Sequence, residues 1–222
     1  MRTVLSIFAA LLITGTVMAQ ENETPAEKKN SLTFHMGPTF PLGDFLSKKL
    51  DNSDAGFAKT GITLDVSYQR LFDDNIGLAA NVFYNMNGLD IKKAEEQYNL
   101  TGLKMDHWQF VGVTVGPSFG FAPSTKTRMD FRVMGGFAKA NSPEINFDGT
   151  LMLKEDWSTS AVFQAGTNMR TDVSSKVYFF SGLDYKYLKP TFDVVMGDGS
   201  TGDPVKQTMS VLNLTIGLGF KF

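Results

Sequence analysis

The sequence lacks cysteine, and it contains two histidines, His35 and His107, among 222 residues. The absence of thiols excludes disulfides, thiolate metal sites and cysteine nucleophiles, and two imidazoles are too few for a histidine-rich metal site. A basic surplus is also missing, because 21 Lys and Arg face 23 Asp and Glu, for a formal net charge of -2. The chain therefore has no excess positive charge to neutralise a phosphate backbone, and we expect no nucleic-acid partner.

Long apolar runs are also scarce, and the clearest one lies at the N-terminus, from Val4 to Val17. This run is shorter than the roughly 20 apolar residues that span a bilayer as a helix. Because Arg2 precedes it and a small residue, Ala19, follows it, the pattern predicts a secretory signal peptide cleaved after Ala19. The predicted organisation is a signal peptide at 1–19, a polar flexible segment at 20–30 and one domain at 31–222.

Apolar and polar residues alternate from Ser31 onward, and clusters of Gly, Pro, Asn and Asp interrupt the pattern at regular intervals. In the clearest segment, Ile62, Leu64 and Val66 alternate with polar neighbours. A period of two places the apolar side chains on one face of a strand, so the pattern predicts an all-β fold. We expect eight strands, at 31–40, 59–71, 76–87, 107–121, 128–138, 157–170, 176–188 and 207–222.

The connections between the predicted strands alternate in length. Short polar turns join the second and third, fourth and fifth, and sixth and seventh strands, whereas the other four links each run to roughly 18 residues. Short turns at one end and long loops at the other are typical of bacterial membrane barrels, which have an even number of strands. The sequence therefore predicts an eight-stranded antiparallel up-and-down transmembrane β-barrel, with both chain ends at the short-turn end.

Alternation alone does not say which face of each strand points into the barrel. A soluble, lipocalin-like carrier has its apolar face inside, around a cavity for an apolar ligand, while a membrane barrel turns that face toward lipid. Small residues suit the narrow interior of an eight-stranded barrel, and glycines on the polar faces favour the membrane barrel. These glycines are Gly77, Gly112, Gly116, Gly120, Gly136, Gly166, Gly182, Gly217 and Gly219.

Aromatic residues gather near both ends of the predicted strands. Two such rings are typical of the interfacial girdles of a membrane barrel. The expected girdles comprise Phe72, Phe121, Phe179, Phe220 and Phe222 at the short-turn end, and Tyr84, Trp108, Phe137, Trp157 and Tyr187 at the long-loop end.

Charged residues on the polar faces would lie inside such a barrel. An unpaired charge in a buried site is costly, so we expect these side chains to form ion pairs with one another. We interpret the network as structural, because eight strands leave an interior only wide enough for side chains. The alternative interpretation is a gated path for ions. The predicted network consists of Asp65, Asp130, Arg132, Arg170, Asp184 and Lys186.

The C-terminal segment VLNLTIGLGFKF resembles the last strand of Gram-negative outer-membrane proteins. This resemblance implies export through the periplasm and recognition by the barrel-insertion machinery. The apolar residues of this predicted insertion signal are Leu214, Ile216, Leu218, Phe220 and Phe222.

A second resemblance lies in HMGPTFPLGDF, from His35 to Phe45. It resembles the Gly-Pro-x-x-Pro-x-Gly-Asp-Phe start of a porin-like family of small outer-membrane β-barrel domains, OmpA/OmpX-type eight-stranded barrels common in Bacteroidetes. The resemblance covers about residues 31–222, nearly all of the mature chain, and implies an outer-membrane location in a Gram-negative bacterium. The family label names no substrate. Pro41 and Gly43 are also expected to end the first strand at the rim of the membrane.

Candidates for catalysis or metal binding are few. Asp106 and His107, with Ser158 or Ser160 opposite, are the best catalytic set, but adjacent strand residues point to opposite faces, so Asp106 is poorly placed to orient His107. The acidic stretches at 51–54 and 198–203 lack the full calcium-loop spacing. We therefore expect no enzyme activity, no metal and no cofactor.

The long loops are the expected location of function, because barrels present variable binding surfaces on rigid rims. Loop 139–156 contains several apolar residues and is expected to form a hairpin around Asp148-Gly149. The preferred hypothesis is a structural or loop-mediated binding role in outer-membrane lipid, with an extracellular partner at the loops. The alternatives are a narrow porin-like channel for ions or small solutes and a soluble, lipocalin-like carrier.

Overall fold

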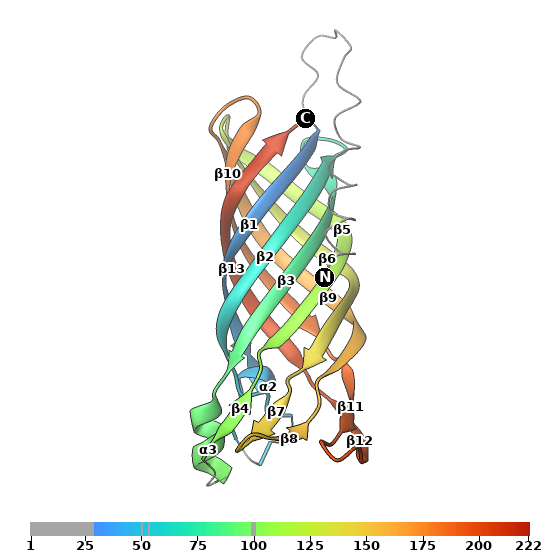
Figure 1. Ribbon diagram of the computed structural model, residues 1–222. Helices are drawn as coiled ribbons and strands as arrows, with labels where there is room; N and C mark the ends of the chain where they lie inside the picture. The colour runs from blue at the N-terminus through green and yellow to red at the C-terminus, as the bar shows by residue number, and fades with distance from the viewer. Residues whose placement is uncertain (1–28, 50, 53, 99–100) are drawn as a thin grey trace.

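A computed structural model describes residues 29–49, 51–52, 54–98 and 101–222. In this part of the chain, eight antiparallel strands close into a barrel in the order β1-β13-β10-β9-β6-β5-β3-β2 (Figure 1). The predicted signal peptide and most of the predicted flexible segment lie outside the described residues. The barrel strands are β1 (Asn30–Leu42), β2 (Ala58–Leu71), β3 (Ile76–Leu89), β5 (Trp108–Ser124), β6 (Thr127–Ser142), β9 (Asp156–Asp172), β10 (Val177–Leu188) and β13 (Met209–Lys221).

The first and last strands close the barrel. Asn30 and Phe222 exchange backbone hydrogen bonds of 3.2 and 3.0 Å, so the ends of the described chain lie together beside the short turns. The other end bears the long loops (Figure 1). The predicted eight-stranded antiparallel barrel is confirmed. Several strands continue past their predicted ends, as β6 does to Ser142, which still pairs with Asp156 of β9.

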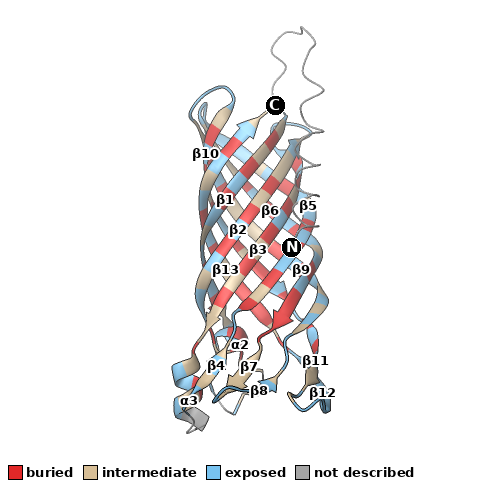
Figure 2. Cartoon of the chain, in the orientation of Figure 1, coloured by how far each residue is buried: buried red, intermediate tan, exposed pale blue. Residues whose placement is uncertain are grey.

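The outer face of the barrel is apolar and its interior is polar. Val113 and Leu214 are 54% and 50% exposed, whereas their neighbours Thr114 and Thr215 are 3% and 1% exposed. Buried and exposed residues alternate along the strands in the same way around the barrel (Figure 2). A soluble carrier with an apolar interior is therefore wrong for this chain, because such a carrier would bury the residues that are exposed here.

The long loops fold into a cap over one end of the barrel. Among the described residues, neither helix is long and apolar enough to cross a bilayer. Asp148 and Gly149 both have positive φ, 48° and 80°, and they turn the chain between two short strands at the predicted position. Strand order in the cap is β4-β7-β8 in one sheet and β11-β12 in another. The cap elements are α2 (Gly43–Leu46), α3 (Ile91–Tyr98), β4 (Leu103–Met105), β7 (Ile145–Phe147), β8 (Thr150–Leu153), β11 (Thr191–Val195) and β12 (Thr201–Lys206).

One residue of the predicted girdles lies elsewhere. The short-turn girdle is exposed on the outer face, as are Phe137, Trp157 and Tyr187 of the long-loop girdle. Trp108 is only 8% exposed and packs against Phe45 and Phe192 inside the cap end of the barrel. Its assignment to the lipid interface is wrong, because Trp108 shares the inward parity of Phe110 and Thr114 along β5.

Candidate functional site

Three ion pairs connect the charged residues of the lumen. Lys186 Nζ lies 2.7 Å from Asp65 Oδ1. Arg132 Nη2 lies 2.8 Å from Asp184 Oδ2, and Arg170 Nη2 lies 2.8 Å from Asp130 Oδ2. The structure thus brings the six charged residues that the sequence singled out into the lumen, each opposite a partner of the other sign. All six are buried.

Neutral polar side chains join two of these pairs, Arg132–Asp184 and Lys186–Asp65, because Asn81 Nδ2 donates to Asp65 Oδ1 at 2.7 Å and to Gln164 Oε1 at 3.3 Å. Gln164 Nε2 donates to Asp184 Oδ1 at 3.1 Å, and its Oε1 accepts a hydrogen bond from Thr114 Oγ1 at 2.8 Å. The two ring nitrogens of His35 form hydrogen bonds with Thr215 and Ser67. Each of these side chains points inward from a different strand, so the network holds the strands of the barrel together across its interior.

Aromatic rings occupy much of the remaining lumen. Phe83, Tyr178 and Phe180 are at most 2% exposed. Lys186 Nζ lies 4.1 Å from the centre of the Phe83 ring, and Arg132 Cζ lies 5.9 Å from that of Phe180. These cations thus contact ring faces as well as carboxylates. Ion-paired and aromatic side chains thus share the interior formed by the described residues, as expected for eight strands.

An apolar cluster seals the lumen at the end that carries the long loops. Phe45 of α2 enters the barrel mouth and packs edge-on against Trp108, with ring centres 5.7 Å apart. Trp108 Nε1 donates to the carbonyl oxygen of Gly56 at 2.8 Å, which ties loop 1 (43–57) to β5. The buried members of the cluster are Phe45, Ala58, Phe83, Trp108, Phe110, Ala138, Ala140, Val162, Leu188, Phe192, Met209 and Val211.

A cavity of about 440 Å³ lies within the cap, above this cluster. Trp108 and Phe192 line it on the barrel side. Loop 1, loop 2 (90–107), loop 3 (143–155) and loop 4 (189–208) all contribute to its walls. Most of the lining is apolar, including Ala94, Leu103, Met105, Ile145, Leu153 and Val194.

Ion pairs and backbone hydrogen bonds hold loops 1 and 2 in place. Asp90 forms two ion pairs, with 2.5 Å between Lys48 Nζ and Asp90 Oδ2 and 3.2 Å between Lys59 Nζ and Asp90 Oδ1. The hydrogen bond from Lys48, followed by that from Lys59, holds the pKa of the Asp90 carboxyl below its usual value. Phe57 adopts a positive φ of 50°, and its carbonyl accepts the N–H of Asp90 at 2.8 Å. A non-glycine residue keeps this conformation only where its surroundings enforce it.

The weaker sequence candidates do not come together. Asp106 and His107 lie exposed in loop 2, while Ser158 and Ser160 pair with Ala140 and Ala138 across β9 and β6. No hydrogen bond or ion pair of the described residues joins members of this set. In the same part of the chain, no three His, Asp or Glu side chains gather as a metal site would require.

The cavity is the feature that sequence reasoning missed. Apolar residues in loop 139–156 were a partial signal, because Ile145 and Leu153 both line it. The contributions of loops 1, 2 and 4 depend on how the cap folds, and alternation along the strands carries no information about that.

Solved structures that resemble this chain are small barrels with low sequence identity to it. A major outer membrane protein from Thermus thermophilus is 12% identical, over 87% of this chain and 99% of that chain, with a TM-score of 0.54. Neisserial surface protein A is 13% identical, over 87% and 97%, with a TM-score of 0.50. Ail, the attachment invasion locus protein of Yersinia pestis, is 15% identical, over 87% and 99%, with a TM-score of 0.47.

Comparison with protein-family models gives no match, and comparison with curated proteins gives none. The likeness to the first two structures supports the fold. The chain has the fold of a small eight-stranded outer-membrane barrel. Its closed barrel and apolar outer face are those of a protein of the Gram-negative outer membrane.

Proposed function

We propose that this protein is an outer-membrane binding protein whose four long loops hold a small apolar ligand above a sealed barrel. The observation that carries the proposal is the cavity of about 440 Å³ in the cap. Its volume lies within the range of small-molecule sites, about 300–1,000 Å³. The expected extracellular partner of the loops is therefore a small molecule.

The lining of the cavity favours a neutral, apolar ligand. Met105 of β4, Leu153 of β8 and Phe192 of β11 face the cavity from three different loops. Gln207, a polar residue of the lining, already donates from Nε2 to two backbone carbonyls, those of Asp54 and Thr208. Transfer of apolar surface from water into such a site is favourable by about 25 cal/mol per Å².

A channel for ions or small solutes is the alternative function. The ion pairs and aromatic rings of the lumen argue against it, as does the apolar cluster below the cap. We propose that the six lumen charges, Asp65, Asp130, Arg132, Arg170, Asp184 and Lys186, serve the structure of the barrel. A role in transport would require water along the same path, and the interior of an eight-stranded barrel is only wide enough for side chains.

The last strand also has a proposed role. Leu214, Ile216, Leu218, Phe220 and Phe222 are all exposed on the outer face. We propose that the barrel-insertion machinery reads this alternating apolar set at the chain end. The signal peptide that the sequence predicts at residues 1–19 would direct the chain to the periplasm beforehand.

Quenching of tryptophan fluorescence tests the proposed ligand site. The chain has two tryptophans, of which Trp108 lines the cavity and Trp157 is exposed on the outer face. In lipid nanodiscs, 1-bromononane should quench Trp108 in a Trp157→Phe variant, and the quenching should saturate. The Trp108→Phe variant reports through Trp157 on simple partition into lipid, which does not saturate at a site.

Two adjacent residues of β8 provide a matched pair of variants. Leu153 lines the cavity, whereas Met152 is 49% exposed and is not part of the lining. Leu153→Arg should abolish saturable quenching of Trp108 because it brings a charge into the cavity, and Met152→Arg should leave it unchanged. Quenching of Trp108 that follows lipid partition in every variant would count against a ligand site in the cap.

A further inference from the structure

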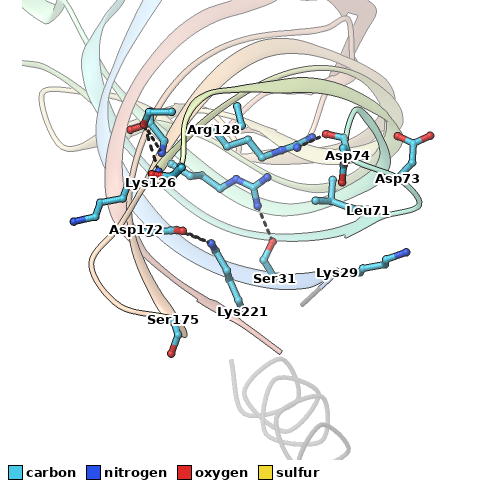
Figure 3. Close-up of a pocket in the computed structure, with 15 residues that line it drawn as sticks. Lys29, Ser31, Leu71, Asp73, Asp74, Lys126, Arg128, Asp172, Ser175 and Lys221 are labelled. Carbon is cyan, nitrogen blue, oxygen red and sulfur yellow. Dashed lines mark hydrogen bonds and ion pairs between the residues drawn. The ribbon is translucent and has the colours of Figure 1, made fainter. Parts of the chain in front are cut away.

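A second pocket, of about 300 Å³, opens at the short-turn end of the barrel (Figure 3). It lies between the short turns and the ends of the described chain, on the side opposite the cap. The lining includes five cationic residues, Lys29, Lys126, Arg128, Arg170 and Lys221. In an outer-membrane barrel the short turns face the periplasm, so this pocket opens toward the periplasm and the inner leaflet.

Two arginines of this pocket share one carboxylate. Arg128 of β6 and Arg170 of β9 are cross-strand partners. Arg128 Nε donates to Asp130 Oδ1 at 2.7 Å, and Arg170 Nη2 lies 2.8 Å from Asp130 Oδ2. Asp130 is fully buried, and Gln69, its other hydrogen-bond donor, is neutral. Two guanidinium groups on one carboxylate leave one positive charge in excess at the floor of the pocket.

The arginines also keep unused donors. Arg170 is 5% exposed, and its Nε has no hydrogen-bond partner among the described residues. Arg128 Nη2 likewise has none, although Arg128 Nη1 donates to the carbonyl of Asp74. Arg170 Nη1 donates to Ser31 Oγ at 3.2 Å, so this guanidinium is held in place while part of it remains unsatisfied. Buried donors without partners are costly, and a ligand that accepts from them would remove that cost.

The carboxylates near the pocket do not cancel this excess. Asp172 is already paired with Lys221, at 2.6 Å. Asp73 Oδ1 accepts the backbone N–H groups of Asn75 and Ile76, which fixes it in the turn. Asp74 lies at the rim, across the pocket from the additional cation Lys126, and Lys29 is a further cation of the lining (Figure 3).

We propose that the short-turn pocket binds a single phosphate-type oxyanion against Arg128 and Arg170. Planar guanidinium groups recognise phosphate by paired hydrogen bonds, and two of them in adjacent strands can contact different oxygens of one group. The anion would be free phosphate of the periplasm or the phosphate of an inner-leaflet phospholipid headgroup. This site is independent of the apolar cavity at the other end of the barrel.

Titration calorimetry tests the site with inorganic phosphate. The protein, purified from membranes in dodecyl maltoside, is titrated with sodium phosphate at constant ionic strength set by sodium chloride. We expect saturable binding of one phosphate per barrel. Arg170→Gln and Arg128→Gln each leave Asp130 with one arginine, and each should weaken binding about tenfold or more, the effect of one charge-assisted hydrogen bond.

Two further variants test whether weaker binding comes only from the loss of a positive charge or from a failure to fold. Lys154 is exposed at the opposite end, so Lys154→Gln loses the same charge and should bind phosphate as the unaltered protein does. Lys126 is an exposed cation of the rim that is not paired with Asp130, and Lys126→Gln should fold normally and weaken binding a few-fold. The shift in gel mobility on boiling verifies that each variant is a closed barrel.

Phosphatidylglycerol added to the same maltoside micelles distinguishes the two sources. Saturable binding of the lipid that depends on Arg128 and Arg170, without binding of inorganic phosphate, would identify a headgroup site. Binding of inorganic phosphate with the same dependence would identify a site for the free anion. The proposal is overturned if neither inorganic phosphate nor phosphatidylglycerol binds saturably. It is also overturned if Arg128→Gln, Arg170→Gln and Lys126→Gln all leave binding unchanged.

Discussion

Lys186 and Asp65 form an ion pair in the middle of the lumen, with 2.7 Å between Nζ and Oδ1 and neither side chain more than 1% exposed. Asp65 also accepts hydrogen bonds from Thr63 Oγ1 and Asn81 Nδ2. The pair joins β10 to β2, two strands that are not neighbours in the barrel. The apolar ring of Phe83 covers the lysine on a further side. Each of the two charges therefore relies on the other for its neutralisation.

Removal of the lysine alone should destabilise the barrel strongly. Lys186→Met leaves the Asp65 carboxylate buried without its cation, and loss of one partner of a buried pair costs about 3–5 kcal/mol in the free energy of unfolding. The double variant Lys186→Met, Asp65→Leu should recover most of this loss, because it removes both charges. Urea unfolding in lipid vesicles, followed by tryptophan fluorescence, measures the difference. Equal stability of the single and double variants would contradict the dependence of one charge on the other.

The lipid-facing assignment makes a separate prediction. Leu214 and Val113 are each at least half exposed on the outer face. Changing either to Arg should cost about 2–4 kcal/mol and impair membrane insertion, because a charge near the middle of the bilayer is poorly tolerated. Thr215→Ser and Thr114→Ser keep the lumen hydroxyls and should have little effect. Similar losses in all four variants would be inconsistent with this assignment.

Alanine substitution of glycines should also affect stability differently on the lumen face and on the outer face of the barrel. A Cβ at Gly166 would lie 2.2 Å from Asp184 Oδ1, so Gly166→Ala must displace the carboxylate that pairs with Arg132. A Cβ at Gly135, on the outer face, meets no atom within 4 Å. We expect Gly166→Ala to lower the free energy of unfolding by about 1–3 kcal/mol, as overpacking does. Gly135→Ala is the control, and a comparable loss there would implicate backbone effects instead of packing.

Alternation along the strands explains why the barrel could be predicted from the sequence. A strand in a barrel has two different environments, lipid and lumen, so residues such as Val113 and Thr114 identify their faces by polarity alone. Trp108 lies inside the barrel because parity along β5, and not its position near a strand end, decides which face it occupies. Its indole N–H reaches Gly56, which is distant in sequence, and no local pattern indicates that contact.

The cap was less predictable because its structure depends on contacts between loops. Helix α3 contains good helix formers, including the Lys93 and Glu96 ion pair one turn apart, but it is short and lies in a stretch interpreted as a loop. The hairpin at Asp148-Gly149 was predictable from its turn residues. Loops 1 to 4 together form the walls of the cavity. Alternation of apolar and polar residues along the strands does not predict how these loops pack against one another.

The ion pairs of Asp90 with Lys48 and Lys59, which hold loop 1, should weaken in acid. The pKa of Asp90 is lowered by hydrogen bonds from Lys48 and Lys59, so the stabilisation is present above the ordinary carboxyl pKa and is lost as pH falls through the lowered folded-state value. In a Trp157→Phe background, Trp108 emission should shift to the red below about pH 4 as loop 1 loosens. Asp90→Asn should show the loosened spectrum at neutral pH and little further change. A pH response that persists in Asp90→Asn would identify another group as its source.

Conductance in planar bilayers separates a sealed barrel from a channel. The lumen contains Phe83 and Phe180 beside the buried ion pairs, and an apolar cluster that includes Trp108 closes the end below the cap. Ions would have to cross these apolar layers without water, where an unpaired charge costs several kcal/mol. We therefore expect no sustained single-channel current from the unaltered protein, with protein-free bilayers as the baseline. Steady currents whose ion selectivity changes in Lys186→Met would instead assign transport to the lumen, because only a conducting path through the barrel would respond to that charge.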